Sequence, residues 1–212
     1  MAGVTAEISM SLDGYIAGPD QTLEQPLGAG GEQLHEWAFA LRTFREAHGM
    51  EGGEAGPDDE IMAESFGSAG AVVMGRRMFS GGAGPWEDDP NADGWWGDEP
   101  PFGVPVFVVT HHRREALTLG ATTFHFVTGG VESAVEQART AAADRRVGLG
   151  GGAEVIGQAL DAGLVDELVI HLVPVVLGGG VGLFDGVAPR RLERARAEES
   201  PTGVVHLWYQ PR

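Results

Sequence analysis

Short apolar segments separated by glycine-rich turns recur along the chain and predict β-strands. The first, Val4 to Leu12, mixes apolar and small residues and ends at the turn pair Asp13-Gly14. Val104 to Thr110 is a continuous apolar run with the β-branched residues of a buried parallel strand. The same reasoning predicts strands at Ala71 to Met74, Thr123 to Thr128, Arg146 to Leu149, Leu168 to Leu177 and Val204 to Tyr209.

Helical spacing of apolar residues appears between these strands. From Gln33 onward, apolar side chains recur every three or four residues, which predicts one continuous amphipathic helix. Its inward positions are Leu34, Trp37, Ala38, Leu41 and Phe44. Further helices are expected at Ile61 to Phe66, Val131 to Ala142 and Ala153 to Ala162. The alternation of strands and helices predicts an α/β fold with a mostly parallel central sheet and antiparallel C-terminal strands, in a single domain over 1–212.

The intervening segments are rich in glycine, proline and acid. Gly49 to Asp59 and Gly81 to Gly103 are expected to be loops, and the second contains Trp86, Trp95 and Trp96. The acidic stretches Glu51 to Glu60 and Glu87 to Glu99 are interpreted as solvated loops.

Charge and composition exclude several functions. The 212 residues carry 14 basic and 31 acidic side chains, for a net charge of −17, which disfavours nucleic-acid and anionic-membrane partners. There is no cysteine and every basic residue is arginine, so thiol and Schiff-base chemistry are absent. No apolar run is long enough to cross a bilayer and no secretory signal is visible, so a cytoplasmic location is expected.

Candidate chemistry gathers directly after the predicted strands, where ligands bind in open α/β sheets. Arg76 and Arg77 follow one strand, the cluster from His111 to Arg114 follows another, and Gly150 to Gly152 follow a third. Arginines, histidines and glycines at a helix start suit phosphate groups. The alternatives are solvated strand caps for the cationic clusters and a tight strand-to-helix turn for the glycines.

Motifs along the whole chain resemble the dihydrofolate-reductase-like superfamily. They are Ser9 to Gly18 (SMSLDGYIAG), Val72 to Phe79 (VVMGRRMF), Val106 to Thr110 before His111, Gly150 to Gly152 before a helix, and Pro174 to Gly180 (PVVLGGG). The similarity is greatest to the bacterial branch related to the C-terminal reductase domain of the riboflavin-biosynthesis bifunctional deaminase-reductase. The deaminase half of that enzyme needs zinc-binding cysteines, which this sequence lacks, so we expect a stand-alone reductase domain.

The resemblance implies a three-layer α/β/α sandwich with eight strands that binds NADPH. Gly75, Arg76 and Arg77 would contact the cofactor phosphates, and Thr110, His111, His112 and Arg113 would hold the 2′-phosphate end. The pyrophosphate would lie on Gly150, Gly151, Gly152 and the helix that starts at Ala153, and the nicotinamide would be bordered by Ser9, Ile16 and Ala17.

The substrate side of the site is less specified. Asp13 is the first candidate for a proton relay or for binding a substrate hydroxyl, and the alternative is a turn-forming aspartate before Gly14. Glu7 on the first strand is a candidate pocket residue. His171 and His206 are interpreted as hydrogen-bonded sheet histidines, and no metal site is expected.

Together these features predict an NADPH-dependent reductase that transfers a hydride to a small heterocyclic or sugar-derived substrate. The favoured type is a 5-amino-6-(5-phosphoribosylamino)uracil reductase. The alternatives are a dihydrofolate or pterin reductase, a nucleotide-binding module that has lost catalysis, and a purely structural or interaction protein. A homodimer is also expected, because related reductase domains pair through late strands and the apolar strand Leu168 to Leu177 would seek a partner.

Overall fold

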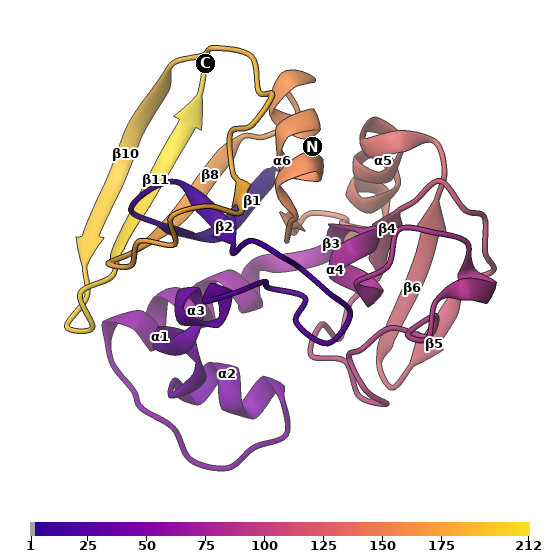
Figure 1. Cartoon of the computed structure of the whole chain (residues 1–212), viewed down its shortest axis with the longest axis horizontal. Coiled ribbons are helices and arrows are strands. Elements are labelled where there is room, and N and C mark those ends of the chain that lie inside the picture. The colour runs from indigo at the N-terminus through magenta and orange to yellow at the C-terminus, as the bar shows by residue number, and fades with distance from the viewer. Residues whose placement is uncertain (1–2) are drawn as a thin grey trace.

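A nine-stranded mixed sheet forms the centre of the molecule (Figure 1). In the computed structural model, which describes residues 3–212, the strand order is β10-β11-β8-β1-β7-β3-β4-β6-β5. The strands are β1 (Val4–Ser11), β3 (Ala69–Gly75), β4 (Val106–Val109), β5 (Leu117–Leu119), β6 (Thr122–Val127), β7 (Arg146–Leu149), β8 (Glu167–Val173), β10 (Leu192–Glu199) and β11 (Val205–Pro211). The strands from β8 through β6 are parallel, while β11, β10 and β5 run antiparallel to their neighbours. The predicted α/β fold is confirmed, with one strand more than the resemblance implied.

Helices cover both faces of this sheet. The apolar sides of α5 (Gly130–Ala142) and α6 (Ala153–Asp161) pack on one face with β1, β3 and β7. The other face, over β8 and β11, is covered by α1 (Glu36–Phe39) and α3 (Pro57–Ser68), with Ile61 of α3 against Val169 and Trp208. α2 (Arg42–Ala47) packs on α3. A short α4 (Arg76–Ser80) follows β3, and 3-10 turns lie at η1 (Gly31–Leu34) and η2 (Trp86–Asp88). None of the helices described over residues 3–212 is long and apolar enough to span a membrane.

The single helix predicted from Gln33 to Phe44 is wrong. The segment is divided into η1, α1 and α2, because Leu41 is extended (φ −69°, ψ 142°) and forms a bridge with Glu54. The break is stabilised from outside, since the Asp59 carboxylate of α3 accepts the backbone N–H of Thr43 at 2.7 Å and the Arg42 guanidinium at 3.0 Å. The periodic side chains still face inward: Leu34, Ala38 and Leu41 are buried.

Three acids in the segments interpreted as solvated loops are buried, which corrects that interpretation. Asp58 and Asp59 are 5% and 1% exposed, because α3 begins at Pro57 rather than at Ile61. The Asp89 side chain is 3% exposed and lies inside the long tryptophan-containing loop. Each of these carboxylates accepts hydrogen bonds from neighbouring groups, which offsets the cost of removing it from water.

The C-terminal strands also differ from expectation. β8 ends at Val173, so Pro174 lies outside the ladder, and β5, β10 and the short β9 (Val181–Gly182) were not predicted. β8 has β1 on one side and β11 on the other, so it is no exposed edge. The reasoning that led from an exposed apolar strand to a dimer is therefore wrong, although the dimer itself stays a prediction.

The sheet opens into a fork at its carboxyl edge. β1 pairs with β7 only from Val4 to Ala6, whereas it continues beside β8 as far as the pair Ser11 and Val173. On the other side of the opening, β7 stays with β3, and the Gly75 N–H donates to the Gly151 carbonyl at 2.8 Å. Such a divergence at the carboxyl ends of parallel strands is where open α/β sheets bind their ligands.

Candidate active site

A glycine turn forms one wall of this fork. Gly150 donates its N–H to the Val73 carbonyl at 3.0 Å, and a Cβ on Gly151 would lie 3.5 Å from the Ile8 side chain on β1. The Gly151–Gly152 peptide is cis. A Cβ placed on Gly152 would meet no atom within 4 Å, so the backbone there faces open space at the start of α6. The turn predicted from the glycines is present, and the open backbone at Gly152 leaves room for an anionic group at the start of α6.

Arg76, expected among the phosphate-contacting residues, is buried rather than solvated. Its Nη2 lies 2.5 Å from Asp89 Oδ2, and its guanidinium carbon lies 3.5 Å from the centre of the Trp86 ring. Burial lowers the pKa of Arg76, and the ion pair with Asp89 opposes this effect. The Nε and Nη1 atoms are buried without a hydrogen-bond partner. Arg76 therefore organises the wall of the fork and retains two unmet donors.

Trp86 connects the long loop to the ends of two strands. Arg76 lies over its ring, and the Arg114 guanidinium carbon is 5.1 Å from the centre of that ring. The indole N–H donates to the His112 carbonyl at 2.8 Å. Arg114 also pairs with Asp93. The tryptophan-containing loop is thus anchored beside the strand ends after β3 and β4.

The neighbouring cations at these strand ends are exposed. Arg77, His111 and Arg113 project from the surface, and within residues 3–212 neither arginine has an ion-pair partner. Thr110 is buried and its hydroxyl accepts the His112 N–H at 3.1 Å, which fixes the turn that carries them. The two cationic clusters of the sequence therefore divide into structural members, Arg76 and Arg114, and available ones.

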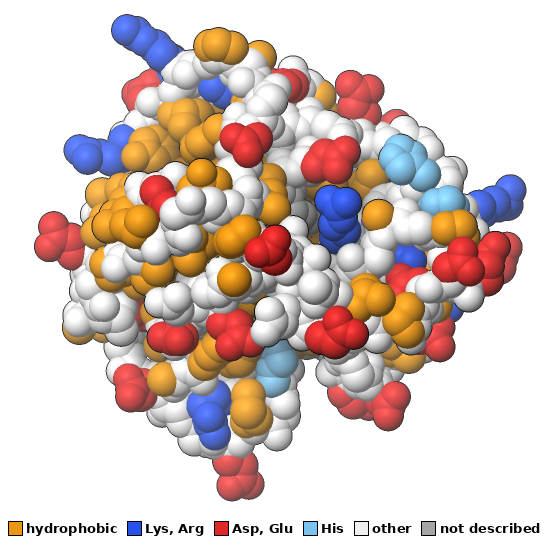
Figure 2. Space-filling model, in the orientation of Figure 1, with side chains coloured by type: hydrophobic (Ala, Val, Ile, Leu, Met, Phe, Trp, Pro, Cys, Tyr) orange, Lys and Arg blue, Asp and Glu red, His pale blue; other side chains and the backbone are white. Residues whose placement is uncertain are grey.

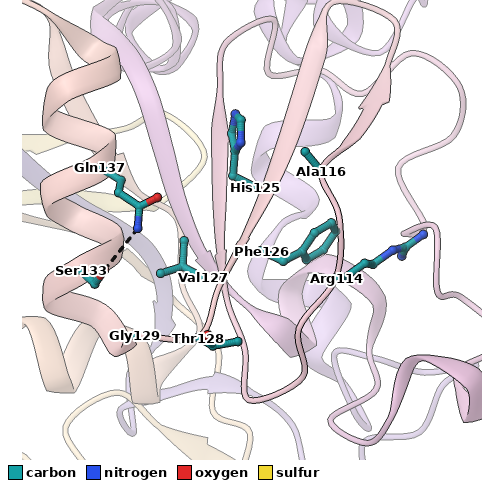
Figure 3. Close-up of a pocket in the computed structure, with 9 residues that line it drawn as sticks. All are labelled: Arg114, Ala116, His125, Phe126, Val127, Thr128, Gly129, Ser133 and Gln137. Carbon is teal, nitrogen blue, oxygen red and sulfur yellow. Dashed lines mark hydrogen bonds between the residues drawn. The ribbon is translucent and has the colours of Figure 1, made fainter.

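An open cavity of about 420 Å³ lies beside this cluster (Figure 3). Its lining comes from the segment before β5, from β6 and from the start of α5: Arg114, Ala116, His125, Phe126, Val127, Thr128, Gly129, Ser133 and Gln137. Gln137 donates to the Ser133 hydroxyl at 3.2 Å on α5. The cavity has a mostly polar lining and lies along the second half of β6 and its connection to α5. The contribution of β6 and α5 to this site was not predicted, because their residues contain no motif.

The residues expected to border the nicotinamide lie on the opposite wall. Ser9 on β1 is buried, and its hydroxyl accepts the Trp37 indole N–H at 3.3 Å. Ile16 and Ala17 are buried in β2 (Tyr15–Ala17), which pairs with β9. Gly180 before β9 has φ +129°, and a Cβ there would lie 2.0 Å from the Ala17 carbonyl oxygen. The glycine motif near the chain end therefore permits the close approach of β9 to β2.

Asp13 has a defined local role. Its carboxylate accepts the backbone N–H groups of Leu177 and Gly178 at 3.1 and 2.7 Å, so it joins the turn after β1 to the segment after β8. Hydrogen bonding by Ser11 and by these amides lowers the pKa of Asp13 below its ordinary value. An exposed carboxylate of this kind is ionised at neutral pH and holds no proton to donate. Its assignment to a proton relay stays a prediction.

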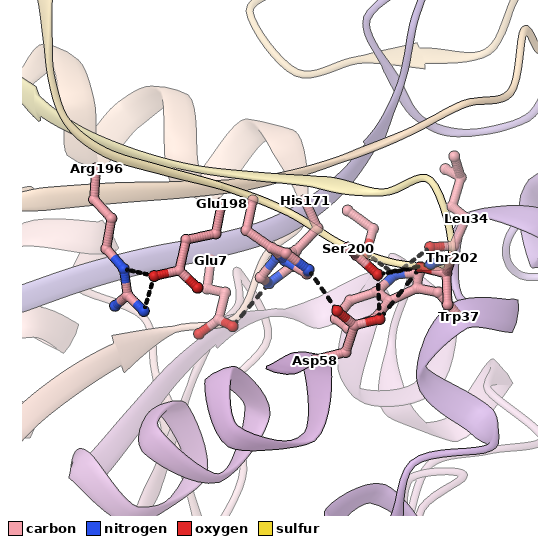
Figure 4. Close-up of polar contacts among 11 residues, drawn as sticks. Glu7, Leu34, Trp37, Asp58, His171, Arg196, Glu198, Ser200 and Thr202 are labelled. Atoms are coloured by element: carbon pink, nitrogen blue, oxygen red, sulfur yellow. Dashed lines mark hydrogen bonds and ion pairs between the residues drawn. The ribbon is translucent and has the colours of Figure 1, made fainter. Parts of the chain in front are cut away.

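A row of four titratable groups, three of them buried and Glu7 half-buried, lies on the sheet face covered by α1 and α3 (Figure 4). His171 Nε2 is 2.8 Å from Glu7 Oε1, His171 Nδ1 is 2.7 Å from His206 Nδ1, and His206 Nε2 is 3.3 Å from Asp58 Oδ1. The interpretation of both histidines as hydrogen-bonded sheet residues is confirmed. Their mutual contact was missed, because it depends on the pairing of β8 with β11, which places the two residues opposite each other. Among the described residues, no cluster of three or more His, Asp or Glu side chains has the arrangement of a metal site.

Fold and site together define the chain as a dihydrofolate-reductase-like α/β protein with a forked sheet. The model of the RibD C-terminal domain family matches residues 2–206, so the chain belongs to this family. A comparison with curated proteins returned no significant match.

Solved structures agree with this fold over the full chain. A riboflavin biosynthesis protein from Shewanella sp. PV-4 superposes with a TM-score of 0.63 at 21% identity, with 100% of this chain and 99% of that chain covered. A pyrimidine reductase-like protein from Corynebacterium diphtheriae gives 0.59 at 14% identity, covering 100% and 92%. The Thermotoga maritima diaminohydroxyphosphoribosylaminopyrimidine deaminase/5-amino-6-(5-phosphoribosylamino)uracil reductase gives 0.59 at 16% identity, covering 100% of this chain and 57% of that chain. At these identities the likeness establishes the fold.

Proposed function

We propose that this protein is an NADPH-dependent reductase that transfers a hydride to a small heterocyclic or sugar-derived substrate, of the 5-amino-6-(5-phosphoribosylamino)uracil reductase type. The observation that carries the proposal is the fork itself. An accessible glycine turn and two clusters of cations lie at the same carboxyl edge of a parallel sheet, in a chain of the RibD C-terminal domain family. NADPH, when bound, supplies the hydride.

The residues present fit such a cofactor. The open backbone at Gly152 and the first turn of α6 would hold the pyrophosphate. Arg76 retains two buried donors without partners, and a nearby phosphate oxygen would satisfy them. Arg77 and Arg113 are exposed cations available to a 2′-phosphate, and the cavity beside β6 would take the adenosine.

The substrate would occupy the β1 side of the fork. Ser9 and Trp37 are joined by a hydrogen bond there, and Trp37 also packs on His171 with ring centres 4.9 Å apart. A riboflavin-type substrate carries a phosphate, and with no lysine in the chain this group would be bound by arginines.

The test is NADPH oxidation with 5-amino-6-(5-phosphoribosylamino)uracil, with dihydrofolate as the pterin alternative, beside calorimetric titration with NADPH. Turnover of the first substrate supports the proposal, and turnover of dihydrofolate alone would assign the protein to the pterin type. Binding of NADPH without turnover across a wide substrate panel would identify a nucleotide-binding module. Absence of binding would overturn the reductase assignment.

A further inference from the structure

Glu7, His171, His206 and Asp58 form a continuous hydrogen-bonded chain, hereafter the carboxylate–histidine chain. The four groups come from β1, β8, β11 and α3, so the carboxylate–histidine chain forms only when the protein folds. The two outer carboxylates are themselves held. Glu7 accepts the Ser65 hydroxyl of α3, and Asp58 accepts the hydroxyls of Ser200 and Thr202 at 2.5 and 3.2 Å.

Three hydrogen bonds in a row require three protons. Two neutral histidines between two carboxylates provide only two, one on each ring. Both outer ring nitrogens face carboxylate oxygens, and these accept protons. The inner nitrogens, 2.7 Å apart, would then face each other with lone pairs alone. The geometry is satisfied when a third proton lies between the rings, so the histidine pair carries one positive charge between two negative ones.

The surroundings favour the ionised form of Glu7 and oppose a full positive charge on each of the two rings. Burial by itself would raise the pKa of Glu7, but hydrogen bonds from His171 and Ser65 and the charges of both histidines outweigh it, so the pKa is lowered. Burial and the charge of His171 lower the pKa of His206, against the opposing influence of Asp58 and Glu198.

One further titratable group faces the pair from the η1–α1 connection. Burial and the charge of His171 lower the pKa of His35 to about 4, so this ring is neutral at physiological pH and adds no second cation. Trp37 packs against both His171 and His206, and its ring centre lies 4.9 Å from the first ring and 5.2 Å from the second.

The carboxylate–histidine chain has one solvent-accessible end. The side chains of His171, His206 and Asp58 are 5%, 0% and 7% exposed, whereas that of Glu7 is 27% exposed. Glu7 is also the first residue of β1 beyond its pairing with β7, so it lies at the base of the fork. A proton held on the histidines can therefore leave through Glu7, and solvent can replace it by the same route.

We propose that the carboxylate–histidine chain stores the proton that the reduction consumes and releases it toward the substrate through Glu7. This inference rests on the proposed function. Hydride addition to a carbonyl or imine carbon moves the π electrons onto the heteroatom, which takes the proton from the Glu7 carboxyl. His171 Nε2 supplies that proton to Glu7, and the His206 Nδ1 proton moves to His171 Nδ1, which leaves both rings neutral. A proton from water then restores the charged pair.

The proton count can be measured without any substrate. In protein labelled with ¹⁵N-histidine, we expect three protonated nitrogens among the four of His171 and His206 at pH 7, with coupling across the Nδ1 to Nδ1 bond. Spectra of His171→Gln and His206→Gln assign the signals. Two neutral rings without that coupling would overturn the proposal. Three protonated nitrogens without turnover of any substrate would instead overturn the proposed function and leave the proton count intact.

The role in turnover is tested with Glu7→Gln and His206→Gln. His48→Gln is the control, because His48 is an exposed histidine directly after α2 and takes no part in the carboxylate–histidine chain. We expect kcat to fall at least about tenfold at pH 8 and less at pH 6, where solvent supplies protons more readily, with NADPH affinity within about twofold of the unmodified protein. His48→Gln should show the unmodified pH profile. If His206→Gln fails to fold, Glu7→Gln at the accessible end decides. An equal loss at every pH, or no loss, would contradict the proposal.

Discussion

Neighbouring arginines of one motif have different roles in this protein. Arg76 and Arg77 are adjacent in sequence, yet the first is buried against Trp86 and Asp89 and the second is exposed without an ion-pair partner in the described chain. The same division separates Arg114 from Arg113. Because α4 starts at Arg76, successive side chains point in different directions around its axis. Substitution of the exposed pair, Arg77 and Arg113, would therefore remove the proposed cofactor contacts without leaving a buried charge unpaired.

The first prediction concerns cofactor choice. NADPH should bind at least about tenfold more tightly than NADH, a difference of ~1.4 kcal/mol. The double substitution Arg77→Ala with Arg113→Ala should erase most of this preference and leave NADH affinity nearly unchanged, since each charge-assisted bond contributes about 1.5–3 kcal/mol. Calorimetry with both cofactors measures it, and Arg194→Ala on the distant β10 is the control. Equal affinities in the unmodified protein would show that the two arginines bind no 2′-phosphate.

The second prediction concerns the buried ion pair between Arg76 and Asp89. Asp89→Asn leaves the Arg76 guanidinium buried without its countercharge, so the free energy of unfolding should fall by about 3–5 kcal/mol in urea at pH 7. Asp93→Asn removes the same charge from the exposed end of the Arg114 pair, where the carboxylate is 76% exposed, and should cost less than about 1 kcal/mol. Similar losses in the two variants would mean that Arg76 finds another partner.

The stabilisation that the Arg76–Asp89 ion pair gives to the folded protein should decrease at acid pH. Burial would raise the pKa of Asp89, but hydrogen bonds from Arg76, Ser80 and Asn91 hold it below its ordinary value. The stabilisation is therefore present above the ordinary pKa of an aspartate and is lost as pH falls through the lower folded-state value. Urea unfolding at a series of acidic pH values should show the unmodified protein and Asp89→Asn converging as pH falls. A constant difference down to strongly acid pH would contradict this.

At the scale of elements, α2 depends on a residue of another helix. Its first turn has no side-chain cap of its own, and the Asp59 carboxylate of α3 accepts the Thr43 N–H there. Asp59→Ala should lower the free energy of unfolding by about 1–2 kcal/mol. Asp59→Asn should lower it less, because the amide oxygen of asparagine can still accept the hydrogen bond from the Thr43 N–H. Hydrogen exchange in α2 should accelerate in the alanine variant. The exposed Glu60→Ala should change little, and equal effects at both positions would refute a capping role.

At the scale of the whole molecule, acidic residues outnumber basic ones. Figure 2 shows acidic side chains distributed around the visible face, in keeping with the net charge of −17. The edge strand β10 carries five charged residues, Glu193, Arg194, Arg196, Glu198 and Glu199, and charged side chains on an edge strand discourage pairing of strand edges. Three exposed apolar side chains, Leu12, Val176 and Phe184, belong to segments that hydrogen-bond around the turn at Gly14.

The last prediction is that the protein forms a homodimer. The two subunits should contact each other through the exposed apolar side chains Leu12, Val176 and Phe184 rather than through β8. Light scattering at micromolar concentration should give twice the chain mass of 22.3 kDa. Association should strengthen as salt rises from low ionic strength, because two subunits of like charge repel each other less when screened. A monomer across this range would contradict the prediction.

The sequence by itself determined the strands β1, β3, β4, β6, β7, β8 and β11, the two helices α5 and α6, the fold class and the positions of the glycine and arginine clusters at strand ends. Each of these rests on local information, since periodicity, turn residues and motif spacing act over a few neighbouring positions. The tertiary structure decided the break at Leu41, the burial of Asp58, Asp59 and Asp89, and the contact of His171 with His206. Those features depend on partners more than a dozen residues away and on the register of β8 with β11, which a short-range pattern does not contain.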